Sequence, residues 1–316
     1  MEVVPYSAEH EAQWDEFCAG SVNATLLHSR RFLGYHGNRF TDRSCLLFAA
    51  GKLVGVFPAA HAAEGKPGWL ASHPGATFGG MVHQGWLTGT RMLDALSTLG
   101  DWYASRGVEK LLYKAVPYFH CRVPAQDDLY ALFRLGAKRL RCDLSCTIDL
   151  AAGTSISERR RRSLKKAQSR VTTSWALERL DELWSVVCEN LSRKHGATPV
   201  HSLEDLALLC ARFPHEIKVC SALMDGRVVA GVILFNSARA WHAQYIAADE
   251  TGYETSAIDA VFASAIDAAR QADARYFDFG ISNEAQGMIL NESLYRFKSE
   301  FGGGGTVHEF YELDFP

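Results

Sequence analysis

The sequence lacks several features by which common classes of protein are recognised. Its 316 residues include eight cysteines but no Cys-x-x-Cys pair, so neither a zinc ribbon nor a dithiol redox site is expected. No apolar run approaches the ~20 residues that span a bilayer. The N-terminus also lacks the basic and apolar regions of a signal peptide. We therefore expect a cytoplasmic protein with reduced cysteines, no bound metal and no membrane insertion.

An excess of charge of one sign is also missing. Lysine and arginine number 33 against 36 aspartates and glutamates, which gives a net charge of −3, so DNA is not an expected partner. There is no GxxxxGK[ST] phosphate loop. No Ser-His-Asp or Cys-His arrangement is visible either, and a covalent acyl-enzyme is therefore not expected.

What the sequence does contain is a hairpin pattern that occurs twice. Residues 46–57 and 221–233 each follow the pattern strand, tight turn, strand, with Gly51 and Gly226 at the turns, 226 − 51 = 175 residues apart. Glycine supplies the positive φ that a two-residue hairpin needs. Each hairpin is followed later by a helix and an apolar strand. The repeat predicts an α/β (α+β) protein of two similar domains, residues 1–152 and 153–316, each a mixed sheet flanked by helices, with a cleft between them.

Periodicity predicts the other elements of both domains. In the first domain we expect helices near 88–105 and 127–135 and strands at 108–114 and 145–150. In the second we expect helices from 157 and over 180–194, strands at 241–247 and 275–280, and a strongly amphipathic helix that begins with a capping box of Ser256 and Asp259.

Two charged residues interrupt apolar patterns near the C-terminus. A helix over 291–303 would place Lys298 in an apolar stripe with Leu294, Phe297 and Phe301, and Asp278 interrupts the apolar strand 275–280. An unpaired buried charge is costly. Lys298 therefore either faces a polar cleft or a counter-charge, or extends from the stripe edge to water. Asp278 either has a structural role at a turn or pairs with Lys298.

Three further segments bear on ligand binding. The basic run at 159–170 is either a solvated helix or a face that grips phosphate. The glycine-rich loop at 72–80 is either a tight connection or a place where backbone amides approach a ligand. The turn at 249–255 has one glycine and two glutamates, which would repel a pyrophosphate.

Together these features resemble the tandem GNAT-fold proteins related to FemABX peptidyltransferases and to bacterial acetyltransferase-like proteins of envelope and polysaccharide pathways. Residues 276–282, 291–294, Phe297-Lys298 and 301–303 are similar to the family's DFG…LN-x-x-L…K-x-x-FG signature. The resemblance implies that an amine of a small molecule or envelope precursor attacks an activated acyl donor directly. The co-substrate would be acyl-CoA or an aminoacyl-tRNA, and no cofactor would be tightly bound.

The resemblance also implies roles for single residues. Lys298 would support the charge that develops on the attacked carbonyl, with Phe297 packing beside it. The chemistry of such a transfer adds further candidates: Asp278 could orient the lysine, or Tyr245 and His242 could handle a proton. The residues expected to bind substrate are His73, Gly75, Phe78, Arg162, Gln244, Asn291 and Phe297.

Two other functions stay open. One is a FemABX-like amino acid ligase that uses charged tRNA as donor, although the chain lacks the long coiled-coil insertion of some peptidyltransferases. The other is a non-catalytic module in which the duplicated scaffold binds a phosphorylated ligand.

Overall fold

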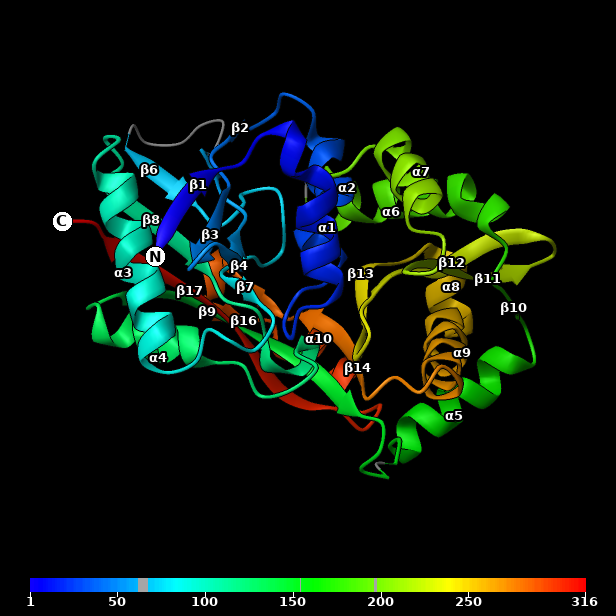
Figure 1. Ribbon diagram of the computed structural model, residues 1–316. Helices are drawn as coiled ribbons and strands as arrows, with labels where there is room; N and C mark the ends of the chain where they lie inside the picture. The colour runs from blue at the N-terminus through cyan, green and yellow to red at the C-terminus, as the bar shows by residue number, and fades with distance from the viewer. Residues whose placement is uncertain (62–67, 154, 196–197) are drawn as a thin grey trace. The chain divides into compact units, whose positions relative to one another are not determined.

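The computed structural model describes residues 1–61, 68–153, 155–195 and 198–316, which form two compact units (Figure 1). The first unit comprises Met1–Leu144, Asn283–Ile289 and Val307–Pro316, and the second comprises Ser145–Ser282 and Leu290–Thr306. Two long strands, β9 (Lys138–Asp149) and β17 (Gly304–Asp314), each have residues in both units. The predicted α/β class with mixed sheets and flanking helices is confirmed. The division at residue 152 stays a prediction.

The first unit contains a four-stranded sheet and a second group of strands. The sheet has the order β1 (Glu2–Pro5), β3 (Cys45–Ala49), β4 (Lys52–Phe57) and β7 (Val82–His83). The second group has the order β17, β8 (Lys110–Lys114), β6 (Trp69–Ala71), β5 (Ala60–His61) and β2 (Thr41–Asp42). The helices are α1 (Glu11–Ala19), α2 (Arg30–Leu33), α3 (Thr90–Ala104) and α4 (Asp127–Arg134).

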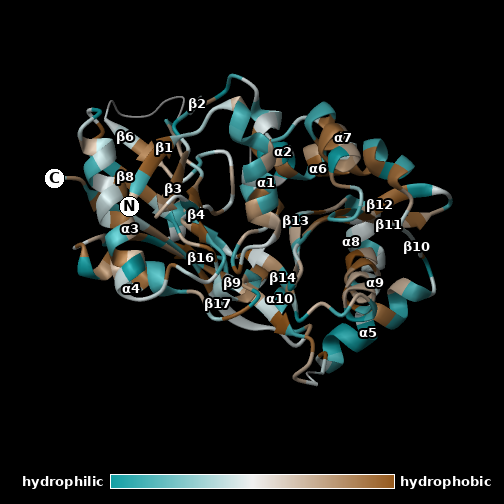
Figure 2. Ribbon diagram, viewed as in Figure 1, coloured by the Kyte–Doolittle hydropathy of each residue, from teal (hydrophilic) through white to brown (hydrophobic). Residues whose placement is uncertain are grey.

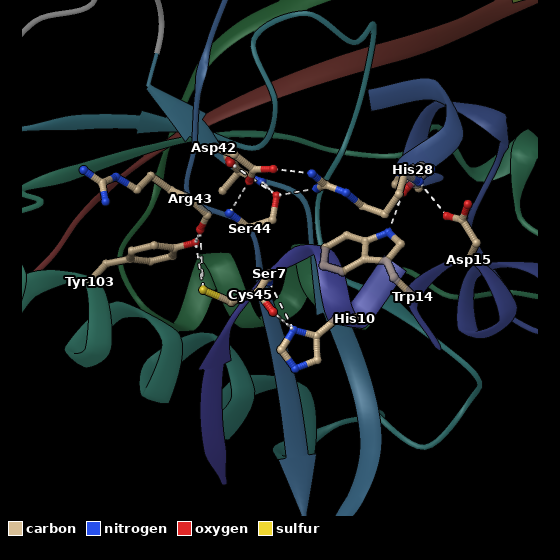
Figure 3. Close-up of polar contacts among 12 residues, drawn as sticks. Ser7, His10, Trp14, Asp15, His28, Asp42, Arg43, Ser44, Cys45 and Tyr103 are labelled. Carbon is tan, nitrogen blue, oxygen red and sulfur yellow. Dashed lines mark hydrogen bonds and ion pairs between the residues drawn. The ribbon is translucent and has the colours of Figure 1, made fainter. Parts of the chain in front are cut away.

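Buried side chains of α1 and α3 are tied to neighbouring loops by hydrogen bonds to backbone carbonyls. The Trp14 indole donates to the carbonyl of His28 at 2.7 Å, and the Tyr103 hydroxyl donates to that of Arg43 at 2.6 Å (Figure 3). Both side chains are at most 1% exposed. Their polar atoms are thus satisfied while their rings fill the core.

The second unit is built on one sheet with the order β10 (Thr172–Ser174), β11 (Ile217–Met224), β12 (Arg227–Asn236), β13 (Ala240–Ala248), β14 (Tyr276–Ile281) and the end of β9. Strands β13 and β14 are parallel, and the other neighbours are antiparallel. Its helices are α5 (Glu158–Gln168), α6 (Leu180–His195), α7 (Leu203–Arg212), α8 (Glu250–Thr255), α9 (Ala257–Gln271) and α10 (Glu292–Ser299). Two short strands, β15 (Asn283–Glu284) and β16 (Ile289–Leu290), precede α10 in the chain, and of these only Leu290 belongs to the second unit.

Helices cover both faces of this sheet. Ala230 and Val232 of β12 belong to the core cluster that contains the inner face of α9. An added Cβ on Gly231, between them, would lie 2.6 Å from Leu183 of α6. Because side chains alternate along a strand, α9 and α6 pack on opposite faces. Figure 2 shows the apolar colouring of α9 against the hydrophilic colouring of α5, which contacts it.

The two predicted hairpins are confirmed, and they share backbone geometry. The turn residues Ala50 and Gly51 have φ of 47° and 75°, and Asp225 and Gly226 have φ of 51° and 79°, as a type I′ turn requires. In each hairpin the register shifts in the second strand soon after the turn, which is a β-bulge. The duplication seen in the sequence is therefore also present in the local structure.

The predicted apolar stripe of α9 is buried, but its predicted capping box is wrong. Ser256 has φ of 59° and makes no side-chain cap hydrogen bond, whereas an N-cap residue normally has an extended backbone. The reason is that α8 ends at Thr255, so Ser256 connects two helices directly. The Asp259 carboxylate binds Arg160 instead, at 2.8 Å. None of the described helices has the length and apolarity to cross a bilayer.

Candidate active site

The Asp278 carboxylate is the centre of a buried polar network in the second unit. Asp278 is fully buried, and it stands opposite Thr147 of β9 and opposite His242 of β13. Side chains directly opposite on neighbouring strands share a face of the sheet. Asp278 Oδ1 accepts from Ser145 Oγ at 2.5 Å and from Thr147 Oγ1 at 2.8 Å, and its Oδ2 lies 2.6 Å from His242 Nδ1. These contacts compensate the burial of a carboxylate.

The sheet opens next to this network. The β13–β14 ladder pairs residues 240–242 with 276–278 and ends at His242, while β13 continues to Ala248. In the register with β12, Leu234 pairs with Ala243 and Ile233 with Tyr245, so Gln244 is a bulge residue. The β14–β9 register also shifts, between Asp278 and Ile281, and Gly280 has φ of 74°. Two irregular strands therefore meet where the ladder ends, a placement typical of functional sites.

Lys298 is the buried residue of α10. It is 3% exposed, whereas Leu294 of the same predicted stripe is 38% exposed, so extension of the lysine to water is wrong. Its Nζ donates to the carbonyl oxygens of Gly280 at 2.9 Å and Ile281 at 2.6 Å. Burial lowers the pKa of Lys298 to about 8, while the charge of Asp278 opposes that shift. The group thus stays largely an ammonium at neutral pH.

The expected direct ion pair between Lys298 and Asp278 is not formed. The lysine binds two backbone carbonyls, and the carboxylate binds Ser145, Thr147 and His242. The strand registers explain this, because they place hydroxyls and an imidazole, rather than α10, opposite Asp278. Asp278 influences Lys298 only through its longer-range electrostatic field.

Helix α10 is held in place at both ends. Asn291 Oδ1 accepts from the backbone amide of Leu294 at 3.0 Å and caps the first turn. At the other end, the Arg160 guanidinium binds Glu300 at 3.0 Å and lies over the Phe297 ring at 4.8 Å. Phe297 also packs against the core ring of Phe262. Asn291 and Phe297 therefore position the helix that carries Lys298.

Tyr245 and Arg162 lie in different surroundings. The Tyr245 hydroxyl lies 2.7 Å from His201 Nδ1, and burial raises the pKa of Tyr245 to about 12. That value makes the phenol a poor base at neutral pH. Arg162 is exposed on α5. These roles, like those of the other predicted site residues, stay predictions.

The predicted ligand loop of the first unit, residues 72–80, is packed against side chains from other segments of that unit. The buried Lys114 ammonium donates to the carbonyls of His73 (at 3.2 Å) and Ala76, and burial lowers its pKa to about 7. An added Cβ on Gly75 would lie 2.3 Å from the His36 ring. Phe78 is 3% exposed and packs against His120 at 4.7 Å. These contacts pack the loop closely, and the substrate-binding roles of His73, Gly75 and Phe78 stay predictions.

Sequence reasoning missed the side chains that hold Asp278. Ser145 and Thr147 alternate with apolar residues on β9, and this alternation was the available signal. Without the register, however, it could not be matched to Asp278. The buried Arg160 was equally hidden within a run of four consecutive arginines.

Comparison with known proteins agrees with this architecture. Residues 154–299 match the family model described as Acetyltransferase (GNAT) domain. No curated protein matches the chain in sequence. Among solved structures, FemX shares 11% identity over 99% of this chain and 97% of its own, with a TM-score of 0.72. L-PGS from Bacillus licheniformis shares 14% identity over 96% and 91%, with a TM-score of 0.63.

A tandem GNAT protein from the clavulanic acid biosynthesis pathway also has this fold. It shares 9% identity over 100% of this chain and 98% of its own, with a TM-score of 0.54. At such identities the likeness establishes the fold alone, and the chemistry must be argued from the residues of this chain.

Proposed function

Because residues 154–299 carry a GNAT-type acetyltransferase domain, we propose that the protein is an N-acyltransferase that forms an amide bond. The amine of a small molecule or cell-envelope precursor attacks the carbonyl of an activated acyl donor directly. The new C–N bond forms, the bond to the carrier breaks, and the carrier leaves as a thiolate or alkoxide that takes up a proton. No acyl-enzyme intermediate is required.

The observation that carries this proposal is the buried ammonium of Lys298. A lysine ammonium has three N–H donors, and backbone carbonyls of Gly280 and Ile281 occupy two of them. The third can donate to the oxyanion that develops on the attacked carbonyl. A fixed donor in a site of low dielectric stabilises such a charge far more than water does.

The end of the β13–β14 ladder supports a place for the acyl donor. Beyond His242, β13 continues for six residues outside that ladder. An extended carrier arm with amide groups can hydrogen-bond to such a strand edge as an added strand would. A donor bound in this way would have its acyl group beside the end of the ladder, near Asp278 and Lys298, and acyl-CoA is the first donor to test.

One feature favours the second candidate, an aminoacyl-tRNA donor. At the start of α8, Asp249 Oδ1 already accepts from the amide of Gly252 at 2.7 Å, and Glu250 and Glu254 add negative charge nearby. A pyrophosphate gripped by this turn would meet a carboxylate at the amide it needs. An aminoacyl ester presents no pyrophosphate there.

The decisive experiment is a donor panel of acetyl-CoA, a long-chain acyl-CoA and bulk charged tRNA, offered with small amines and envelope-precursor amines. Free thiol release reports the CoA donors, and transfer of labelled amino acid reports the tRNA donor. Turnover that resists RNase supports acyl-CoA, whereas turnover that RNase abolishes and salt weakens steeply supports tRNA.

A thermal-shift screen of the same compounds separates catalysis from binding. A ligand at about a hundred times its Kd stabilises the folded state by roughly 2.7 kcal/mol. Stabilisation without turnover from any donor would overturn the enzymatic proposal and leave the non-catalytic binding module.

A further inference from the structure

We propose that His242, held by Asp278, is the general base that takes the proton from the attacking amine. This deepens the proposed acyl transfer and rests on it. The family match assigns no such role to any residue, and the geometry of the β13–β14 pair carries the argument.

The carboxylate fixes the imidazole. A carboxylate only accepts hydrogen bonds, so the 2.6 Å contact requires His242 Nδ1 to donate its proton to Asp278 Oδ2. When an imidazole with its proton on Nδ1 is neutral, its lone pair lies on Nε2. The Ser145 and Thr147 hydroxyls hold Oδ1 of the same carboxylate, and Thr147 Oγ1 also lies 2.6 Å from Thr306 Oγ1. The imidazole is therefore oriented by a carboxylate that is itself fixed.

The pair lies where the acyl carbonyl is expected. His242 and Asp278 are the last residues paired between β13 and β14. An added Cβ on Gly280 would lie 3.5 Å from His242 Cε1, while the Gly280 carbonyl accepts from Lys298 Nζ. The same glycine thus lies next to His242 and binds Lys298 through its carbonyl. One group would take the proton of the nucleophile, and the other would stabilise the oxyanion.

Other titratable groups nearby are less suited to accept a proton. Lys298 on α10 and Cys146 on β9 interact electrostatically with Asp278, and Tyr245 lies further along β13. Burial raises the pKa of Cys146 and of Tyr245 to about 12, so both stay protonated at neutral pH. Phe235, opposite His242 on β12, does not titrate.

With His242 as the base, every proton in the reaction has a donor and an acceptor. The amine nitrogen forms the new bond to the carbonyl carbon while its proton passes to Nε2 of His242. When the tetrahedral intermediate collapses, the carrier leaves, and the imidazolium gives the proton to the carrier or to water. Asp278 keeps its negative charge throughout and stabilises the imidazolium, as in other carboxylate–histidine pairs.

The test combines kinetics with the protonation state of the imidazole. Using the donor of the panel that supports turnover, we expect His242→Gln to lower kcat/KM by about 10²–10⁴-fold and to remove the acidic limb of its pH profile. Asp278→Asn should lower kcat/KM by a similar factor. His215→Gln, which changes an exposed histidine of the same unit, should have no effect.

Nitrogen-15 NMR of histidine-labelled protein gives a readout that needs no substrate. We expect the His242 resonances of the wild type, assigned by their loss in His242→Gln, to show the Nδ1–H tautomer. An Nε2–H tautomer, or an unchanged pH profile in a folded His242→Gln variant, would overturn the role of His242. Absence of wild-type turnover with every donor would instead overturn the proposed function, and this inference with it.

Discussion

The Nζ atom of Lys298 lies 2.9 Å from the carbonyl oxygen of Gly280, so a hydrogen bond joins α10 to the irregular part of β14. Gly280 adopts φ of 74°, a conformation that residues with a side chain rarely adopt. The position of the ammonium therefore depends in part on the backbone conformation of this glycine.

Replacing Gly280 with alanine should damage activity more than stability. Left-handed backbone costs a residue with a Cβ roughly 1–2 kcal/mol, so Gly280→Ala should lower the free energy of unfolding by about that amount. The added Cβ would also lie 3.4 Å from the Ala243 carbonyl. Relaxation of the bulge would then move the carbonyl that holds Lys298, and kcat/KM should fall at least tenfold.

Gly226→Ala is the matched control for this substitution. Gly226 has φ of 79°, and an added Cβ would meet nothing within 4 Å. Urea denaturation of Gly226→Ala should show a similar decrease in the free energy of unfolding, while its kcat/KM should be unchanged. Equal activity of the two variants would show that the Gly280 backbone does not position the reaction.

The protonation of Lys298 should limit activity at high pH. Its pKa is about 8 in the folded protein because burial disfavours the charge. With an acceptor amine that is neutral throughout the range, kcat/KM should fall about tenfold per pH unit above that value. A profile that stays flat well above pH 8 would contradict an ammonium role.

The lowered pKa of Lys298 also predicts that the protein becomes more stable as the pH rises above about 8. A lysine in the unfolded chain keeps its proton up to about pH 10.4, so between pH 8 and that value the unfolded state binds more protons. The free energy of unfolding should therefore rise with pH, by at most about 3 kcal/mol from this group. Urea denaturation at a series of pH values should show this rise in the wild type and a smaller one in Lys298→Met.

Loss of Arg160 should destabilise the second unit strongly. Arg160 is 6% exposed, and its guanidinium binds Asp259 at 2.8 Å and Glu300 at 3.0 Å. Arg160→Met would leave a buried carboxylate without its cation, which typically costs about 3–5 kcal/mol. Burial already raises the pKa of Asp259 to about 6, so the loss should be smaller at pH 5, where the carboxyl is protonated.

Arg162→Met is the control for this prediction because Arg162 is exposed on the same helix. Its unfolding free energy should change by no more than about 0.5 kcal/mol. If urea denaturation gave equal losses for the two variants, the buried ion pairs would not be what stabilises α5 against α9 and α10.

His28 should make the first unit sensitive to acid. It is fully buried, and burial lowers its pKa to about 4. As the pH falls below about 6.5, the unfolded state takes up a proton that the folded state does not. The free energy of unfolding should then fall by up to about 1.4 kcal/mol per pH unit from this group.

A non-titrating side chain at this position should weaken the dependence. His28→Gln should be less stable than the wild type at pH 7, because it disturbs the 3.2 Å contact with the Gly79 carbonyl. Between pH 7 and pH 5, however, its free energy of unfolding should fall by less than that of the wild type. Equal losses over this interval would show that His28 does not drive the acid sensitivity.

The parts of the fold that could be predicted are those that local pattern determines. The duplicated hairpins followed from turn glycines and alternating strands, and the stripe of α9 followed from its period. The strand β17 could not be predicted, because its pairing with β8 joins residues about 200 positions apart. Such pairing is set by the register of distant strands.

The residues of the candidate site also fall into those that the sequence could predict and those that it could not. Lys298 and Asp278 could be found because each breaks an apolar pattern. Their partners could not, because the contacts of Asp278 come from β9 and β13, whose registers are fixed only in the folded sheet. The sequence therefore predicted which charges were unusual, while only the structure shows what binds them.

The most direct measurement compares kcat/KM of acyl transfer for Lys298→Met with that of Lys218→Met. Lys218 also donates to a backbone carbonyl, that of Pro214 at 2.9 Å, but its contact is exposed. Loss of one oxyanion donor typically costs about 10²–10³-fold, so we expect a loss of that size for Lys298→Met and none for Lys218→Met. A folded Lys298→Met variant with near wild-type kcat/KM would contradict the proposed role of the buried ammonium.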